Sequence, residues 1–516
     1  MAELRPVGLA TLAARAFEEL ERNGSIFDLP RRSFVLEPGH HVVVHGRRVG
    51  APLGPAAGPH TQLAQNIVSC WLAGGRVMEL KTVQVLDRVK IARPCIDART
   101  VGYNVEWSQE LSLDQSRAEY VKASMLIELL AHWFRVEPAV LFDVSVGYDF
   151  AGITSERVVG FLKRMIDARS TVDALRDELP GQFRDFDFTT NIAKSVTLST
   201  FHGCPPHEIE RIADFLMAEL GLDLAIKLNP TLLGEKAVND ILHDRLGYAD
   251  VIVPATAFGN DPTFEDVARI QRRAKELGRS FAVKLTNTLV VENRRGVLPG
   301  EFAYLSGPPL HVLAMHLVQR FRHAFGTALP ISFSAGIDRV NYPDAVRLGL
   351  KPVTVCTDLL KQGGYARLHA YASELTRRMG AMTMEQFATG NIDDYIAELD
   401  RNPRYHRDRV EHPPRKTGVP LEVFDCAMCD LCIPACPNDA NFRIPLAMAK
   451  PHQIVTLDDL CNDCGNCETF CPDLGAPNRV KLRVRMDDDI NDSRIRAAVH
   501  DPSRVNFINA IALENA

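Results

Sequence analysis

No apolar run in this sequence approaches the roughly 20 residues that a membrane-spanning helix needs. A formal net charge of -6 at pH 7 gives no excess of positive charge, so neither nucleic acid nor an anionic membrane is an expected partner. The N-terminal segment lacks the apolar core of a secretory signal, and its spacing predicts an amphipathic helix that ends at Gly24. We therefore expect a cytoplasmic protein that contacts no membrane.

The sequence also lacks a G-x-G-x-x-G motif and any low-complexity segment. Without that motif, a Rossmann-type site for NAD or FAD has no support. The composition, 46% hydrophobic and 24% charged, is typical of a globular protein. At 516 residues the chain is too long for one ordinary core, so two or more domains are expected.

Cysteine is scarce until near the end of the chain, where two blocks share the spacing C-x2-C-x2-C-x3-C and are each followed by proline. This is the spacing of bacterial two-cluster ferredoxins, in which the fourth cysteine of each block ligates the [4Fe–4S] cluster of the other block. Clustered cysteines in a reducing compartment also indicate metal or redox chemistry more often than disulfides. The predicted ligands are Cys426, Cys429, Cys432, Cys436, Cys461, Cys464, Cys467 and Cys471.

Zinc is the main alternative for these blocks. A structural zinc site uses four ligands, commonly in two separated pairs, and does not explain two tight runs of four cysteines. We therefore favour two [4Fe–4S] clusters over a zinc-binding structural tail. Cys70 and Cys95 have no motif around them and are interpreted as packing residues.

Upstream of a polar stretch near 386–420, short β-branched segments alternate with longer amphipathic ones. Such alternation predicts a parallel sheet covered by helices. There is one more candidate strand than a (β/α)8 barrel needs, and we interpret 249–256 as an insertion. The candidate strands are 51–57, 76–83, 140–147, 195–200, 224–229, 249–256, 281–287, 330–336 and 352–357.

The predicted fold is therefore α/β, a (β/α)8 TIM barrel followed by a small α+β ferredoxin-like domain. The loops after the seventh and eighth barrel strands carry small residues before a helix start, a pattern that can hold a phosphate but also serves turn geometry. The predicted divisions are a helical segment 1–40, the barrel 41–385, a linker 386–420, the two-cluster domain 421–485 and a tail 486–516.

Several segments together resemble the FMN-binding barrel of the dihydroorotate and dihydropyrimidine dehydrogenase family. They are APLGPAAGPHTQLAQNI, ELKTVQ, YNVEWSQE, TLSTFHGCPPHEIE, IKLNPTLLG, VKLTNT and SAGI…VCTDLLKQGGY. More closely, they are similar to the YgfK-like bacterial proteins known as selenate reductase subunits. The likeness covers about residues 1–385. The cysteine-rich tail resembles that of dihydropyrimidine dehydrogenase, whereas the nearer relatives of the barrel carry a glutamate-synthase-like extension.

This resemblance implies that FMN binds in the barrel mouth. Lys81 matches a position at the N1/O2 edge of the flavin, where a lysine favours the anionic reduced ring. The alternative for Lys81 is a structural ion pair, and for the other residues it is turn and barrel packing. The implied FMN contacts are Ala57, Lys81, Thr82, Lys227, Ser306, Gly307, Ala335, Gly336, Cys356 and Thr357. The implied contacts to a planar cyclic amide substrate are Asn104, Asn287 and Thr288.

The sequence departs from the family at the catalytic acid/base. Thr200 occupies the aligned place and Cys204 follows four residues later. A threonine hydroxyl has too high a pKa to donate a proton readily, whereas a thiol with a pKa of ~8.5 suits neutral pH better. We predict Cys204 as the acid/base, with His202 as a substitute or relay; the alternative is that Cys204 only fills space beside two prolines.

These parts predict an iron–sulfur flavoprotein oxidoreductase that reduces or oxidises a C=C or C=N bond of a purine- or pyrimidine-type cyclic amide. Electrons would come from a partner subunit that binds FAD and NAD(P)H, or from a soluble ferredoxin, and the acidic segment 485–494 could dock it. A different class stays open, namely an electron-relay or docking subunit of a selenate- or molybdenum-type reductase with an inactive barrel. The departure at Thr200 supports that alternative. We also expect an oligomer.

Overall fold

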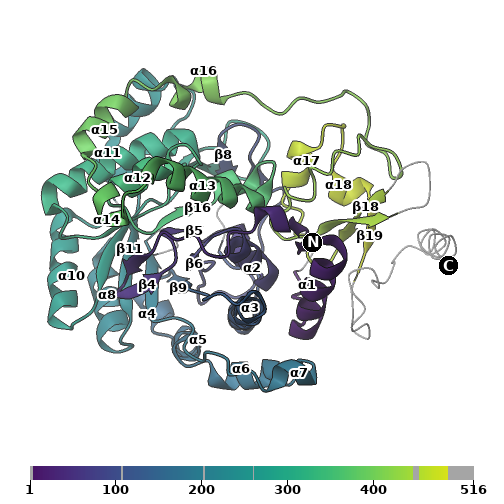
Figure 1. Cartoon of the computed structure of the whole chain (residues 1–516). Helices are drawn as coiled ribbons and strands as arrows, with labels where there is room; N and C mark the ends of the chain where they lie inside the picture. The colour runs from purple at the N-terminus through teal and green to yellow at the C-terminus, as the bar shows by residue number, and fades with distance from the viewer. Residues whose placement is uncertain (1–3, 106–107, 201–203, 260, 446–451, 486–516) are drawn as a thin grey trace.

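The computed structural model describes residues 4–105, 108–200, 204–259, 261–445 and 452–485. A large α/β unit lies beside a smaller cysteine-rich one near the C-terminus (Figure 1). Two sequence predictions fall outside the described residues: the proposed relay His202, and nearly all of the acidic segment 485–494. No helix within the described ranges is long and apolar enough to cross a bilayer.

The large unit is the predicted TIM barrel. Its strands pair in parallel in chain order, from β5 round to β16 and back to β5 through Leu53 and Val353. The ring closes between the first two strands, where Arg76 N donates to Leu53 O at 2.7 Å. The strands are β5 (Leu53–Pro55), β6 (Val77–Glu79), β9 (Leu141–Val146), β10 (Ser195–Ser199), β11 (Asp223–Leu228), β12 (Phe281–Leu285), β15 (Ile331–Phe333) and β16 (Val353–Val355).

Eight of the nine predicted strands therefore form the barrel. The ninth candidate, 249–256, contains no strand, and its last two residues begin the 3-10 turn η6 (Ala255–Ala257). The interpretation of this segment as an insertion is confirmed. Its apolar residues Val251 and Val253 are buried, which explains why the segment resembles a strand in sequence.

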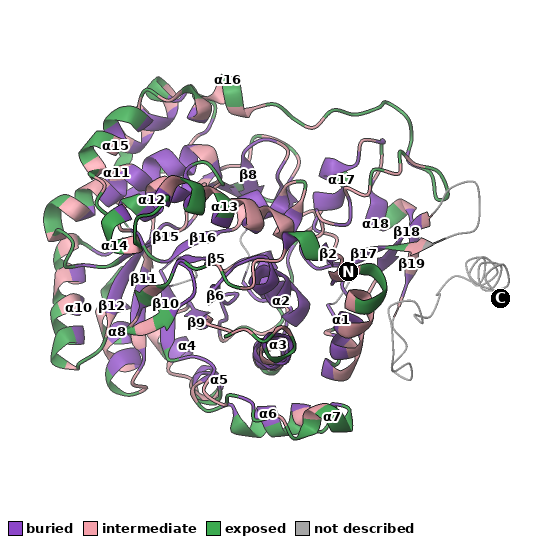
Figure 2. Cartoon of the chain, in the orientation of Figure 1, coloured by how far each residue is buried: buried purple, intermediate pink, exposed green. Residues whose placement is uncertain are grey.

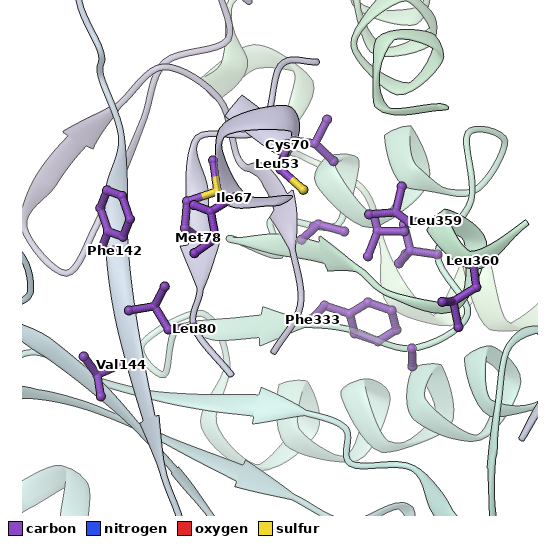
Figure 3. Packing of buried hydrophobic residues seen from close by; sticks show 14 of the residues in the cluster. Leu53, Ile67, Cys70, Met78, Leu80, Phe142, Val144, Phe333, Leu359 and Leu360 are labelled. Carbon is purple, nitrogen blue, oxygen red and sulfur yellow. The ribbon is translucent and has the colours of Figure 1, made fainter. Parts of the chain in front are cut away.

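Helices surround the strands. Most of them, such as α8 and α10, bury the side that packs on the strands and expose the other side, whereas α2 is buried all round (Figure 2). Figure 3 shows this packing, with Ile67 on a helix lying near Leu53 and Met78 on the first two strands. The amphipathic segment between β10 and β11 forms α8, preceded by a 3-10 turn at Pro206–Glu208. The main helices are α2 (Ala64–Leu72), α3 (Leu113–Phe134), α5 (Glu156–Ile166), α8 (Ile209–Ala218), α10 (Phe264–Glu276), α11 (Pro308–Phe325), α12 (Tyr342–Arg347) and α13 (Arg367–Met379).

A second, four-stranded sheet was not predicted from the sequence. Its order is β13-β14-β8-β7 and all its pairs are antiparallel. The strands are β7 (Ile96–Asp97), β8 (Gly102–Asn104), β13 (Leu289–Glu292) and β14 (Phe302–Ser306). They belong to long loops that follow barrel strands, so the sheet lies at the carboxyl end of the barrel. Runs of two to five residues are too short to show a reliable alternating pattern.

The N-terminal segment begins with the predicted helix, α1 (Leu9–Asn23), which ends at Gly24 with a φ of 62°. That left-handed conformation is readily adopted by glycine and is common at helix ends. A hairpin of β3 (Val42–Val44) and β4 (Arg47–Val49) follows. Its Val44 and Val49 pack against the first residues of β6 and β9, so the hairpin covers the amino end of the barrel.

The small unit contains a three-stranded sheet and two short helices. They are β17 (Asn441–Pro445), β18 (His452–Leu457), β19 (Leu482–Val484), α17 (Asn466–Phe470) and α18 (Pro477–Val480). The predicted linker 386–420 is only partly extended, because it contains α15 (Ile392–Leu399), which packs against α11. The exact division between the two units stays a prediction.

Candidate functional site

A cavity opens at the carboxyl ends of the barrel strands, beside the four-stranded sheet. In TIM barrels this end carries the active site, because the loops that follow the strands converge there. Gly307 lies next to Ser306 at the cavity edge. The sequence-predicted residues that line the cavity are Ala57, Lys81, Thr82, Asn104, Lys227, Asn287, Thr288, Ser306, Ala335, Gly336, Cys356 and Thr357. The structure therefore brings together residues that are spread over 300 positions of sequence, from Ala57 to Thr357.

Glycine allows two backbone segments to meet at one side of this cavity. Gly336 has a φ of 52°, and a Cβ there would lie 2.2 Å from the Gly307 carbonyl oxygen. Gly102 is equally restricted, since its Cβ would lie 2.3 Å from Ser306 Oγ. That hydroxyl accepts a hydrogen bond of 2.8 Å from Thr357 Oγ1. The result is a narrow wall of backbone and small hydroxyl groups at the amino end of α11.

Buried lysines give the cavity a positive charge. Burial lowers the pKa of Lys81 to about 8, and burial together with the nearby Lys284 lowers that of Lys227 to about 8. Both side chains therefore remain mostly protonated at pH 7. Lys284 itself forms a buried ion pair with Glu79, and both groups hydrogen-bond Thr354. The cavity thus favours an electron-rich or anionic ligand.

The two asparagines predicted to contact the substrate both line the cavity. Asn104 comes from β8 of the four-stranded sheet, and its Nδ2 donates to Val105 O at 2.7 Å. Asn287 follows β12, and its Nδ2 donates to Asn229 Oδ1 at 2.8 Å and to Lys227 O at 3.3 Å. Hydrogen bonds to the protein therefore fix both amide groups before any ligand binds.

The predicted acid/base residues lie in a neighbouring cavity, which shares Thr288 and Tyr304 with the first. Thr200 Oγ1 donates to Lys227 O at 2.7 Å, so this hydroxyl is already committed to the backbone. Burial, assisted by Glu208 and Asp149, raises the pKa of Cys204 to about 12. The sequence argument gave this thiol the pKa of a free cysteine, which suits neutral pH. That argument is wrong, because burial near two carboxylates raises the pKa of a thiol.

The two cysteine blocks approach each other crosswise. Burial raises the pKa of Cys461, Cys464 and Cys467, and the nearby Cys436 raises each further. Burial likewise raises the pKa of Cys432, and Cys467, Cys471 and Cys429 add to it. This neighbourhood matches the predicted exchange of fourth cysteines. Within the described residues, no group of three His, Cys, Asp or Glu side chains is arranged to hold a metal ion. Cluster ligation by these thiols stays a prediction.

The second cysteine block touches the wall of the main cavity. Cys464 O accepts hydrogen bonds from Cys95 N at 3.1 Å and from Ile96 N at 3.0 Å. Asn466 Nδ2 donates to Leu360 O at 2.7 Å. Ile96 and Leu360 both line the cavity, so a single layer of residues separates it from this block. Cys95 is buried, as expected of a packing residue, but its contact with Cys464 was not foreseen.

Sequence reasoning missed several polar residues of the site. Tyr103 and Tyr304 come from the unpredicted sheet and line the main cavity. His60 lies buried behind the Gly58–Pro59 turn, where burial lowers its pKa to about 4 and keeps it neutral. Tyr103 and His60 stand inside segments quoted above for the family likeness, which is the one signal that could have selected them.

Comparison with known proteins places the barrel in a sequence family. Residues 27–407 match the family described as "Oxidoreductase YgfK, N-terminal TIM-barrel domain". The oxidoreductase YgfK of Escherichia coli strain K12 is 40% identical over 467 residues, which cover 84% of this chain and 45% of that protein. The protein of the same name from Escherichia coli O157:H7 gives the same values. The chain thus spans less than half the length of these curated relatives.

Solved structures of DHODH from Eimeria tenella are also similar to the chain. The ligand-free form has a TM-score of 0.47 and 18% identity, with 74% of this chain and 98% of that chain covered. The complex with ferulenol has a TM-score of 0.45 and 17% identity, with 72% and 91% covered.

Proposed function

This chain belongs to the YgfK oxidoreductase family, and from that premise we propose that it is an FMN- and [4Fe–4S]-dependent oxidoreductase acting on a cyclic amide. The observation that carries the proposal is the contact between the second cysteine block and a lysine- and asparagine-lined cavity at the active end of the barrel. Electrons would pass between the cysteine-rich unit and the cavity across the Cys95–Ile96 segment.

The cavity has features that suit FMN. Gly336 packs closely on the Gly307 backbone at the cavity edge, and Ser306 and Thr357 offer hydroxyl groups beside the amino end of α11. Those hydroxyls would bind the phosphate, because Pro308 and Pro309 at the start of α11 have no N–H to offer. Lys81 and Lys227 would stabilise negative charge on the electron-poor ring. When bound, FMN would supply two-electron hydride chemistry coupled to one-electron carriers.

The eight block cysteines suit two iron–sulfur clusters by residue type, spacing and crosswise proximity. Burial raises the thiol pKa of six of them, and metal coordination is the usual way in which buried thiols become thiolates. The six are Cys432, Cys436, Cys461, Cys464, Cys467 and Cys471. The block that contains Cys464 would hold the cluster nearer to the cavity, since its backbone touches the cavity wall.

Asn104 and Asn287 would hold the amide edge of a planar ring over the cavity floor. We keep Cys204 as the proton donor in this proposal, with a narrower role. A thiol with a pKa of about 12 remains protonated at neutral pH, so it can donate a proton but is a poor base. The reacting bond would be C=C or C=N in a purine- or pyrimidine-type ring.

We also propose that reducing equivalents come from outside this chain. A partner subunit with FAD and an NAD(P)H site, or a soluble ferredoxin, would deliver them. The thiol of Cys429 is exposed, so the block that contains it lies on the outer side of the small unit. That block would be the entry point for electrons.

Anaerobic purification of the full chain tests the proposal. We expect yellow-brown protein with one FMN and about eight iron and eight sulfide ions per chain. Addition of oxidised purines and pyrimidines to the reduced protein should restore the flavin absorbance near 450 nm for at least one ring class. Protein that holds zinc in place of iron, or that binds no flavin, would contradict the assignment.

One observation favours a second candidate function, an electron-relay subunit with an inactive barrel. Thr200 is committed to Lys227 O, and the pKa of Cys204 is raised to about 12, so neither residue is an efficient acid/base. A relay would contain both cofactors, yet no ring compound would reoxidise its flavin. A reduced ferredoxin would still exchange electrons with it, so the same absorbance experiment separates the two functions.

A further inference from the structure

Asp261 lies outside the main cavity but is linked to it through two asparagines. Its Oδ1 accepts a hydrogen bond from Asn229 Nδ2 at 2.7 Å, and its Oδ2 accepts one from Thr231 Oγ1 at 2.5 Å. Asn229 Oδ1 in turn accepts from Asn287 Nδ2 at 2.8 Å. Asn229 lines the neighbouring cavity and Asn287 the main one, so the chain of hydrogen bonds runs through the wall between them.

The Lys227 carbonyl oxygen at one end can only accept, and so can Asp261 at the other end in its ionised form; burial raises the pKa of Asp261, while hydrogen bonds from Thr231 and Asn229 favour the ionised form. An ionised carboxylate has no hydrogen to donate, so Asn229 must turn its NH2 towards Asp261 and its oxygen towards Asn287. Asn287 must then offer its NH2 to Asn229, and the second hydrogen of that NH2 goes to the carbonyl oxygen of Lys227 at 3.3 Å. If the amide of Asn229 were rotated by 180°, its oxygen would face the carboxylate of Asp261 and its NH2 would face the NH2 of Asn287. Neither pair could form a hydrogen bond.

The amide oxygen of Asn287 is therefore the atom left for a ligand. Asn104 is turned in the same sense, because its Nδ2 donates to Val105 O, which is also only an acceptor. A ligand edge that meets these oxygens has to supply hydrogen-bond donors, since a carbonyl oxygen there would be repelled and left unpaired.

We propose that Asp261 is a positioning residue that acts through Asn229 to present the oxygen of Asn287, and that the substrate is a ring which offers N–H groups to this oxygen. The inference rests on the proposed function, because it assumes that the main cavity holds the ring substrate. The family likeness does not say whether the site binds the N–H groups or the carbonyl oxygens of the ring, and the inference answers that question.

The first test compares ring ligands that differ only in N–H groups. The probes are uracil against 1,3-dimethyluracil, and xanthine against 1,3,7-trimethylxanthine, titrated into the FMN-loaded full chain while the flavin absorbance is followed. We expect at least one parent ring to bind 10- to 100-fold more tightly than its methylated form, the usual loss when a buried oxygen is left unpaired. Equal binding of both forms, or binding of neither parent, would overturn the inference.

The second test changes the hydrogen-bond chain itself. Asp261→Leu removes the acceptor, so Asn229 and Asn287 can turn, and the preference for N–H rings should fall by about 10-fold or more. The separate variant Asp261→Asn should largely keep the preference for N–H rings, because its amide oxygen can still accept a hydrogen bond from Asn229 Nδ2. Thr231→Val is the matched control, since it removes the other hydrogen bond to Asp261 and leaves Asn229 untouched.

The variants also separate failure of this inference from failure of the proposed function. If all variants keep FMN and iron but Asp261→Leu keeps the full N–H preference, Asp261 has no positioning role. The same holds if Asp261→Asn loses as much as Asp261→Leu. If the unchanged protein binds no FMN, the proposed function itself has failed. The comparison of methylated and parent rings in the unchanged chain remains decisive even if Asp261→Leu fails to fold.

Discussion

The charge on Lys81 is the feature of single residues that the site depends on most. Its ammonium group is buried, and its pKa is lowered to about 8 from an ordinary value of 10.5. The folded protein therefore bears a cost for keeping this group charged below pH 8. Such a cost is typical of functional sites.

This cost predicts a pH-dependent stability difference. Between about pH 8 and pH 10.5 the unfolded chain keeps the proton of Lys81 and the folded chain loses it, so folding is favoured as the pH rises through this window. The variant Lys81→Met should be more stable than the parent at pH 7, by on the order of 3 kcal/mol, and the difference should shrink towards pH 10. Chemical denaturation of flavin-free protein at several pH values measures it.

A stability difference that stays constant from pH 7 to pH 10 would contradict the buried, depressed pKa of Lys81. Lys351→Met serves as the control for the loss of any lysine, because Lys351 is exposed.

Cys204 supports a second prediction at this scale. Because its thiol has a pKa of about 12, the pH–rate profile should show no inflection from it between pH 6 and pH 9. Cys204→Ala should slow turnover by about 10²- to 10⁴-fold if the thiol donates the proton, without loss of FMN. Equal turnover in Cys204→Ala would show that another group donates it. Cys70→Ala, at a buried cysteine of α2, is the control for loss of a buried thiol.

Site residues could be predicted from the sequence only where they lie close together along the chain. The cysteine blocks carry their pattern within eleven residues each, so they were recognised directly. Lys81, Asn104 and Asn287 were reached only through the likeness to a family. Asp261 gave no signal, because it meets Asn229 across 32 residues and its partners depend on how two loops fold against each other. The pKa of Cys204 was misjudged for the same reason, since burial is a tertiary property.

At the scale of elements, hydrophobic alternation was sufficient to find the barrel. Strands that are buried on both faces read as short runs of β-branched and apolar residues, and all eight barrel strands were found in this way. The four-stranded sheet was missed because strands such as β7 and β8 have only two or three residues. That sheet carries Asn104, so part of the site geometry depends on an element that periodicity does not reveal.

The approach of the loop after β15 to the start of α11 gives a prediction at this scale. Gly336→Ala would place a Cβ 2.2 Å from Gly307 O at a positive φ, and the two backbones would have to move apart. We expect at least a 10-fold loss of FMN affinity with the iron content unchanged. Gly181→Ala is the matched control, because a Cβ there meets nothing within 4 Å. Full FMN retention in Gly336→Ala would place the flavin elsewhere.

At the scale of the whole molecule, the cysteine-rich unit is held against the barrel by specific polar contacts. Asn466 Nδ2 bridges the two units, with Leu360 O and Ala435 O each at 2.7 Å. Arg15 of α1 reaches Asp439 at 2.5 Å, which ties the N-terminal helix to the same unit. Two separate segments of the chain thus fix how the second cysteine block faces the cavity.

Loss of the Asn466 bridge should therefore slow electron exchange between the two units. Asn466→Ala leaves two buried carbonyl groups unpaired, and we expect slower flavin reduction by about 10-fold in stopped-flow mixing with a chemical reductant of the clusters. Gln453→Ala is the control, because the Gln453 side chain donates to Phe424 O inside the small unit. Identical rates in both variants would show that the interface does not carry the electrons.

The most direct test of the whole account is a count of electrons. A coulometric reductive titration of the anaerobically purified chain, followed by absorbance, should consume about four electrons per chain, two for one flavin and one for each of two clusters. The yellow absorbance should be lost in the same titration. A total of about two electrons without flavin bleaching, or none at all, would contradict the joint presence of flavin and clusters.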